Sequence, residues 1–340
     1  MSMKPHLESA QLDGFEIKAR MAGFISLKTY KARFNETTGE MEPIGAPVKE
    51  LGFHNLITDT GLDYIWNAPT YAYGYAYLYN RCTVGTGNTT PAFTDTALAN
   101  PIANVVALGG SDADVVDSYV AGPPAYWKAV QTYRFSTGAA AGNLTEIGFI
   151  PINATLLFSR ALIVDADGNP TTLVVEADEI LDVTYELRVY LDLTDTIGTF
   201  ESDGVTYDTV IRMADVDNPP DLQGRLANNS DGLNASISLY DGALGSVTNI
   251  PSGSTYAQTY NNGGSWGSYA TGSHFQTLTT VTPVGSANWT NGVKAMYVLA
   301  PYFKFQISFI DPITGKGIPK VTGEKMSITI RFSWGRYSAT

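Results

Sequence analysis

Two runs of alternating apolar and polar residues, at 156–165 and 180–193, most constrain what this chain can fold into. Alternation with a period of two places successive side chains on opposite faces of a β-strand. Between the runs lies the turn signal DGNP at 167–170. Gly and Asn favour tight reversals, so we expect antiparallel strands in a β-meander.

A similar arrangement returns near the C-terminus. There YFKFQISFID begins at Tyr302 and EKMSITIRFSW begins at Glu324, with a Gly-containing reversal between them. Aligning Asp165 with Asp311 and Glu179 with Glu324 brings strand, reversal and strand into the same order. The chain is therefore predicted to contain one β-unit twice.

One segment has a helical pattern instead. Between residues 55 and 66, three apolar residues are spaced i, i+3 and i+4, and Thr58 or Asp59 precedes them as a suitable N-cap. These apolar residues are Leu62, Ile65 and Trp66. We expect one short helix here.

Strand signals elsewhere complete an all-β pattern. Residues 14–34 alternate well enough for one or two strands, and 126–136 and 143–152 are each expected to form a strand. A polar connection is expected at 35–46, and 81–122 is interpreted as one strand followed by a long irregular loop. The fold class predicted is all-β, built from two related antiparallel β-sandwich units with one short helix and long loops.

The length of 340 residues gives room for about two domains. The stretch 194–249 is rich in Asp, Asn and Gly, which favours a boundary near 195–205. We predict an N-terminal β-sandwich domain at 1–195 and a C-terminal β-rich domain at 196–340, with a polar loop insertion around 252–273.

Charge and hydropathy exclude several classes of partner. The net charge is −12, and no cluster of Lys and Arg is present, so a nucleic-acid groove is not expected. No run reaches the roughly 18 apolar residues of a membrane span. The N-terminus lacks the apolar core of a secretory signal, so the chain is expected to stay in the compartment where it is made.

Residues with catalytic or metal-binding potential lack a working arrangement. Cys82 is the only cysteine, and a buried, inert thiol is expected; His6, His54 and His274 are isolated from one another. The glycines at 85 and 87 lie in a turn rather than a phosphate loop, because Pro91 and a Thr run follow them. No catalytic residue, metal site or cofactor is predicted.

Acidic residues raise two further possibilities. Asp165, Asp167, Asn169 and Glu176 occupy positions 1, 3, 5 and 12 of a calcium-loop spacing, but position 6 is Pro170 rather than Gly, so a hairpin turn is favoured. Carboxylate pairs suited to a polysaccharide depolymerase are available at 112–117 and 178–182. Spacing alone cannot identify such a pair, and solvated acidic loops are the preferred interpretation.

The surface is expected to be poor in charge and rich in tyrosine. Charged residues make up 16% of the chain, and there are 20 tyrosines. Interface cores are depleted in charge and enriched in tyrosine, although a monomer with a neutral polar surface has the same composition. Alternate tyrosines share one face of a strand and would form an interface or a glycan platform, or would belong to a Gly-broken loop. The residues proposed for this platform are Tyr71, Tyr73, Tyr75, Tyr77, Trp266 and Tyr269.

Four segments, in this order, resemble bacteriophage virion proteins of the tail, tail-fibre and collar appendage type. They are NLITDTGLDYI at 55–65, TVGTGNTTPAFTDTALANPI at 83–102, GNLTEIGFI at 142–150 and LLFSRALIVDADGNPTTLVVEADEILDVTYELRVYLDL at 156–193. The resemblance covers about residues 50–193 and does not extend to the C-terminal half.

The resemblance implies a non-enzymatic structural subunit of a phage particle, assembled in the bacterial cytoplasm and located in the virion. Its partners would be copies of itself in a ring or trimer, and other virion proteins. A receptor-binding or glycan-binding fibre module, which contacts a host surface glycan, is the alternative. The site within the particle and the copy number stay open.

Overall fold

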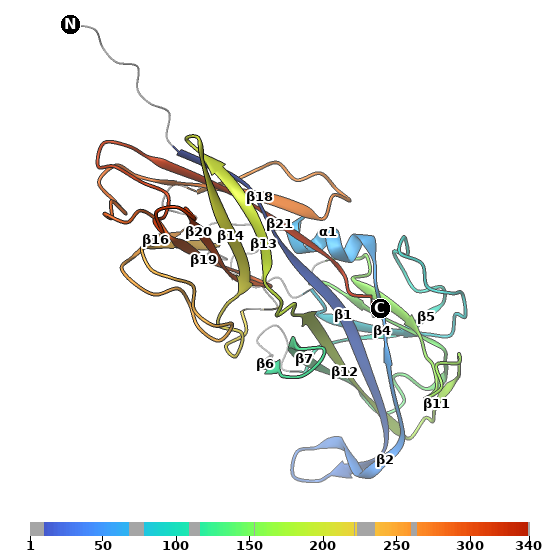
Figure 1. Ribbon diagram of the computed structural model, residues 1–340. Coiled ribbons are helices and arrows are strands. Elements are labelled where there is room, and N and C mark those ends of the chain that lie inside the picture. Colours follow the sequence, from blue (N-terminus) through green and yellow to red (C-terminus); the bar gives the residue numbers. More distant parts are fainter. Residues whose placement is uncertain are drawn as a thin grey trace, which may run out of the picture.

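The computed structural model confirms an all-β fold with one short helix (Figure 1). The structure describes residues 10–67, 78–108, 116–152, 154–220, 222, 235–259 and 264–338. Within these ranges the strands form four sheets, and the helix α1 spans Asp59–Asn67.

The largest of these, the long sheet, has eight strands in the order β17-β18-β21-β1-β12-β7-β6, with β2 also paired to β1. Its strands are β1 (Ala10–Asn35), β2 (Glu40–His54), β6 (Val116–Val120), β7 (Tyr126–Phe135), β12 (Glu179–Tyr190), β17 (Gly264–Trp266), β18 (Phe275–Thr282) and β21 (Met326–Arg336). The strand β1 runs through the length of the molecule and pairs with β2, which follows it in the sequence, with β12 from the middle of the chain and with β21 near the C-terminus (Figure 1).

Three smaller sheets complete the fold. The five-stranded sheet, in the order β3-β10-β9-β4-β5, contains β3 (Leu56–Ile57), β4 (Arg81–Gly85), β5 (Pro101–Val106), β9 (Glu146–Ile150) and β10 (Ser159–Leu162). The six-stranded sheet, in the order β13-β14-β20-β19-β15-β16, contains β13 (Thr196–Ser202), β14 (Val205–Met213), β15 (Ser236–Tyr240), β16 (Thr255–Thr259), β19 (Ala295–Ala300) and β20 (Phe303–Ile310). A two-stranded sheet pairs β8 (Gly142–Leu144) with β11 (Leu173–Val175).

The long sheet buries one face along its whole length, as the alternating burial of β7 and β12 shows. At one end this face meets the five-stranded sheet, where the rings of Tyr185 and Phe149 lie 4.2 Å apart. At the other end it meets the six-stranded sheet, where Phe332 and Phe303 are 5.2 Å apart. Two sandwich-like halves therefore share one continuous layer and one apolar core.

The shared layer bears on the predicted domains. The five-stranded sheet lies wholly within 1–195 and the six-stranded sheet wholly within 196–340, whereas the long sheet takes strands from both ranges. The boundary near 195 coincides with the passage of the chain from the long sheet into the six-stranded sheet, and the division into two domains stays a prediction.

The predicted meander is wrong in its pairing. The run at 156–165 forms β10, whereas the run at 180–193 forms β12 in the opposite layer, paired with β1 and β7. The tight turn between them does form, because Asp165 N donates to Asn169 O at 2.9 Å. Alternation defines which face of a strand is buried, but it does not define which sheet the strand joins.

The repeated β-unit is visible in the turns. Asp311 N donates to Lys316 O at 2.8 Å, in the position of the Asp165 turn, and the amides of both Glu179 and Glu324 close a turn to the residue three positions earlier at 3.1 Å. The strands that follow, β12 and β21, flank β1 on opposite sides, one antiparallel and one parallel. The local geometry thus recurs, while the strand direction relative to β1 does not.

Several segments expected as connections contain strands. Residues 40–46 belong to β2, the stretch 81–122 holds β5 and β6 as well as β4, and 143–152 is divided between β8 and β9. The polar region 252–273 includes β16 and β17. Pairing with a neighbouring strand supplies the backbone hydrogen bonds that a weak local pattern does not predict.

The helix α1 begins as predicted. Thr58 Oγ1 accepts a hydrogen bond from Gly61 N at 2.9 Å, which makes Thr58 the N-cap. Leu62 and Ile65 are buried and Trp66 is half-buried, in agreement with the expected apolar face.

Replacing Gly61 by alanine is expected to destabilise the protein by about 1–3 kcal/mol, although alanine normally favours a helix. A Cβ at this position would lie 2.1 Å from the backbone oxygen of Phe158, so α1 and the segment that leads into β10 must separate. Urea unfolding of Gly61→Ala tests this expectation. An unchanged or raised midpoint would contradict the close packing of α1 on this segment.

Candidate functional site

The predicted tyrosine platform lies partly outside the described residues. Tyr71, Tyr73, Tyr75 and Tyr77 fall in the gap at 68–77. Trp266 is half-buried against the chain's own core, with its ring 5.2 Å from that of Trp66 and 5.4 Å from that of Phe332. Its indole therefore helps to attach the polar segment to α1 and β21.

Tyr269 is held in the same way. Its ring stacks on Trp334 at 5.9 Å, and its hydroxyl donates to Asp63 Oδ1 at 2.5 Å. Burial, together with this carboxylate, raises the pKa of Tyr269. Gly272 N donates to the same oxygen at 2.7 Å. The rings of Trp266 and Tyr269 therefore pack largely against other residues of the same chain. A role of these two rings in an interface or in glycan binding stays a prediction.

A buried ionic cluster forms where the segments of the resemblance meet. Arg160 Nη2 lies 2.8 Å from Glu146 Oε2, and Arg160 Nη1 lies 2.5 Å from Asp95 Oδ2. Glu146 is completely buried, and its oxygens also accept three backbone hydrogen bonds at 2.7–3.0 Å. The donors are the amides of Gly87, Ala99 and Asn100.

This Glu146–Arg160 cluster fastens the loop at 86–100. Arg160 lies on β10, and its Nη2 donates to the backbone oxygen of Thr89 at 3.0 Å and to the hydroxyl of Thr89 at 2.8 Å. Because both Glu146 oxygens are occupied by four donors, the carboxylate is a structural anchor rather than a reacting group. Sequence reasoning missed it, although a Glu within TEIGFI and an Arg within LFSRALI are unusual in buried strands.

Cys82 is fully buried in the five-stranded sheet, as expected for an inert thiol, and burial raises its pKa well above the usual range. Since only the thiolate reacts, we expect native protein to resist a disulfide reagent at pH 8 and unfolded protein to react with one equivalent. Absorbance of the released thiolate measures both. Rapid labelling of native protein would contradict the described burial.

The calcium-loop spacing forms a turn. Asp165 Oδ1 accepts the amides of Asp167 and Asn169 at 3.0 and 2.9 Å, and these backbone bonds lower the pKa of Asp165. Across the described part of the chain, no group of three His, Cys, Asp or Glu residues is placed to hold a metal ion. His54 is the last residue of β2, His274 immediately precedes β18, and His6 lies outside the described residues.

The clearest surface feature is an arm formed by residues 33–48, at the end of β1 and the beginning of β2, which projects beyond the rest of the molecule (Figure 1). Phe34 pairs directly with Met41, so both side chains lie on one face of the hairpin. The arm's large apolar side chains are substantially exposed: Phe34 (55%), Met41 (42%), Ile44 (41%) and Val48 (48%).

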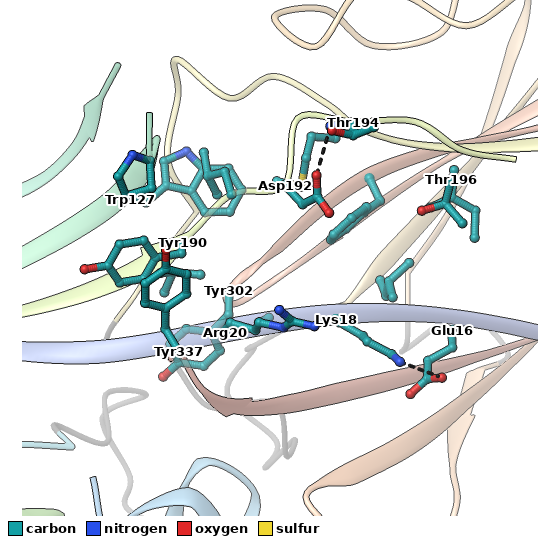
Figure 2. Close-up of a pocket in the computed structure, with 18 of the residues that line it drawn as sticks. Glu16, Lys18, Arg20, Trp127, Tyr190, Asp192, Thr194, Thr196, Tyr302 and Tyr337 are labelled. Carbon is teal, nitrogen blue, oxygen red and sulfur yellow. Dashed lines mark hydrogen bonds and ion pairs between the residues drawn. The ribbon is translucent and has the colours of Figure 1, made fainter. Parts of the chain in front are cut away.

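A second feature is a pocket of about 610 Å³, the β1 pocket, between β1 and the chain that leaves β12. Figure 2 shows its polar rim: Glu16, Lys18 and Arg20 come from β1, and Asp192, Thr194 and Thr196 face them. Tyr190 and Tyr337 stack at 3.6 Å beside the rim. Apolar lining comes from Trp127, Val189, Ile211, Met213, Tyr302 and Phe305.

The charged side chains of this rim differ in whether they have an ion-pair partner. Lys18 Nζ is 3.4 Å from Glu16 Oε2, whereas exposed Arg20 has no ion-pair partner among the residues that the structure describes. Asp192 Oδ1 accepts the amide of Thr194 at 3.0 Å, which shapes the opposite wall. The pocket therefore offers a guanidinium and a carboxylate outside any ion pair of the described residues, together with hydroxyl groups and apolar surface, a combination suited to binding.

Comparisons with protein-family models, with curated proteins and with solved structures found no match. No helix within the described ranges has the length and apolar character needed to span a membrane.

Proposed function

We propose that this chain is a non-enzymatic structural subunit of a bacteriophage particle, in the tail, collar or fibre assembly, and that it acts through subunit interfaces. The exposed apolar arm is the observation that carries the proposal. Four large apolar side chains on a projecting hairpin are unfavourable in water, and a free sheet edge beside them favours pairing with another chain.

The Glu146–Arg160 cluster supports the same function. The three segments that build it belong to the ordered set of motifs that resembles phage appendage proteins. The cluster holds a long surface loop in place and offers no reactive group. This is expected of a structural subunit, which contributes to an assembly through the shape of its surface.

Phage particles purified from a culture whose phage genome encodes this chain test the proposal. We expect mass spectrometry to find the chain in several copies per particle, and a C-terminal tag to place it in the tail, collar or fibre. A cytoplasmic host protein serves as the control for contamination. Particles that lack the chain, or that contain it only at the level of that control, would overturn the proposal.

A receptor-binding or glycan-binding fibre module is the second candidate, and the β1 pocket is the observation that favours it. Aromatic faces and hydroxyl, carboxylate and guanidinium groups around about 610 Å³ are suited to a short saccharide. The half-buried ring of Tyr337, which lines the pocket and is stacked on Tyr190, would supply the face that packs on the sugar ring.

If this candidate holds, Tyr337→Ala should weaken binding of a host-surface oligosaccharide by about tenfold, since loss of an aromatic contact costs roughly 1–1.5 kcal/mol. Saturation-transfer NMR with the oligosaccharide measures the effect, and Ile313→Ala on an exposed loop is the control. Equal signals from wild type and Tyr337→Ala would remove the pocket as a glycan site.

A further inference from the structure

The β1 pocket lies beside a part of β1 that pairs with another strand on one side only. On one side β1 pairs with β21 from Ala10 to Met21, and on the other it pairs with β12 only from Arg20 onward. Among the described residues, no strand pairs with Gly14–Ala19 on the β12 side. A strand's free edge presents unpaired N–H and C=O groups, so this wall of the pocket is a site for strand addition.

The arm offers a matching edge. In the part of the chain that the structure describes, β2 pairs only with β1, so its outer edge is free from Glu40 onward. The arm cannot fold back into its own pocket, because both lie on one continuous strand. At roughly 3.3 Å per residue, Lys18 and Phe34 are separated by about 50 Å along β1.

The arm and the β1 wall of the pocket also match in charge and in apolar surface. The tip of the arm carries Glu36 and Glu40, which are exposed and without an ion-pair partner among the described residues. The β1 wall of the pocket presents the guanidinium of Arg20, while the exposed carboxylate of Asp192, also outside any ion pair of these residues, lies on the facing wall. The apolar side chains Phe34 and Met41 would meet the apolar lining of the pocket. Opposite charges at the rim fix the register of a contact, and buried apolar groups supply most of its free energy.

We propose that the arm of one copy docks in the β1 pocket of a second copy, with the β2 edge added beside Gly14–Ala19. This inference rests on the proposed function, because it assumes that the chain assembles with itself. Arm and pocket are different surfaces at distant points of the same strand, so the contact is heterologous. Repetition of such a contact closes into a ring or continues as a filament.

Cysteine cross-linking tests the contact directly, because the native Cys82 is completely buried and is not expected to compete with the introduced thiols. Thr37→Cys on the arm and Thr196→Cys in the pocket are prepared as separate variants and mixed under mild oxidation. Docking raises the local concentration of the two thiols, so we expect about tenfold more disulfide-linked dimer than from Thr37→Cys mixed with Ile313→Cys. Ile313 is 92% exposed and does not line the pocket.

Charge reversal supplies the second measurement. Arg20→Glu should weaken self-association by about tenfold, and Glu36→Lys with Glu40→Lys in the same chain should restore it. Lys325→Glu, an exposed substitution of the same charge type, is the matched control and should have no effect. Restoration would not follow if Arg20→Glu had merely disturbed the fold.

The two proposals fail in different ways. Cross-linking no higher than the control pair, or a pocket that still binds a saccharide in the assembled protein, would overturn arm docking. If the chain is nevertheless abundant in phage particles, the structural role stands with another interface. If the chain is missing from particles while the arm and pocket thiols still cross-link, the contact stands and the phage role is overturned.

Discussion

Replacing Glu146 by glutamine is expected to lower the free energy of unfolding by about 3–5 kcal/mol, because it leaves the Arg160 guanidinium in a buried site without its main counter-charge. The amide also presents a donor where the amides of Gly87, Ala99 and Asn100 need acceptors. Urea unfolding followed by circular dichroism measures the loss.

A matched control is Asp178→Asn, which removes an exposed carboxylate 2.8 Å from Lys31 Nζ. Exposed ion pairs contribute little to stability, so this variant should unfold almost as the wild type does. Combining Glu146→Gln with Arg160→Met should cost less than the sum of the two single changes, since the residues act as one unit. Equal stability of Glu146→Gln and Asp178→Asn would refute the anchoring role.

Limited proteolysis gives an independent readout of the same cluster. When Glu146 no longer holds Gly87 and Asn100, the loop at 86–100 should open locally and become a cleavage site before global unfolding. Cleavage elsewhere, with this loop intact, would show that Glu146 supports general stability rather than this loop.

Replacing Phe34 and Met41 together by serine is expected to weaken self-association by about a hundredfold or more, because central apolar side chains of an interface each contribute roughly 2 kcal/mol. Stability should not fall, since both side chains are largely exposed in the single chain. Sedimentation velocity over a range of concentrations measures the association, and urea unfolding measures the stability.

Ile313→Ser is the control for this pair, because it removes an even more exposed apolar side chain on another loop. It should sediment as the wild type does. An unchanged distribution for the double variant would show that the arm is not an interface, and a loss of association in both variants would show only a general surface effect.

The features predicted correctly from sequence are local ones. The helix α1 followed from Thr58 as N-cap and from the spacing of Leu62 and Ile65, all of which act within two turns. The strand β7 was predicted from the strand-forming residues at 126–136, and one of its faces lies in the core throughout. The turns after Asp165 and Asp311 were predicted from the DGNP signal at 167–170 and from the Gly-containing reversal near the C-terminus, and in the structure both Asp side chains accept nearby amides.

The features that sequence reasoning missed depend on distant partners. The parallel pairing of β1 with β21 joins segments about 300 residues apart, and no local pattern indicates it. The Glu146–Arg160 cluster requires Asp95, Glu146 and Arg160 to meet from three elements. The β1 pocket exists because β12 ends opposite Arg20, a detail of register rather than of residue type.

We propose that this chain is a structural subunit whose arm and sheet edges contact neighbouring copies, and a density map of the phage particle, at a resolution that separates strands, tests this. We expect copies of the chain repeated about a symmetry axis, with each arm lying across the β1 pocket of the next copy. A map that lacks the chain, or that shows every arm surrounded only by solvent, would contradict it.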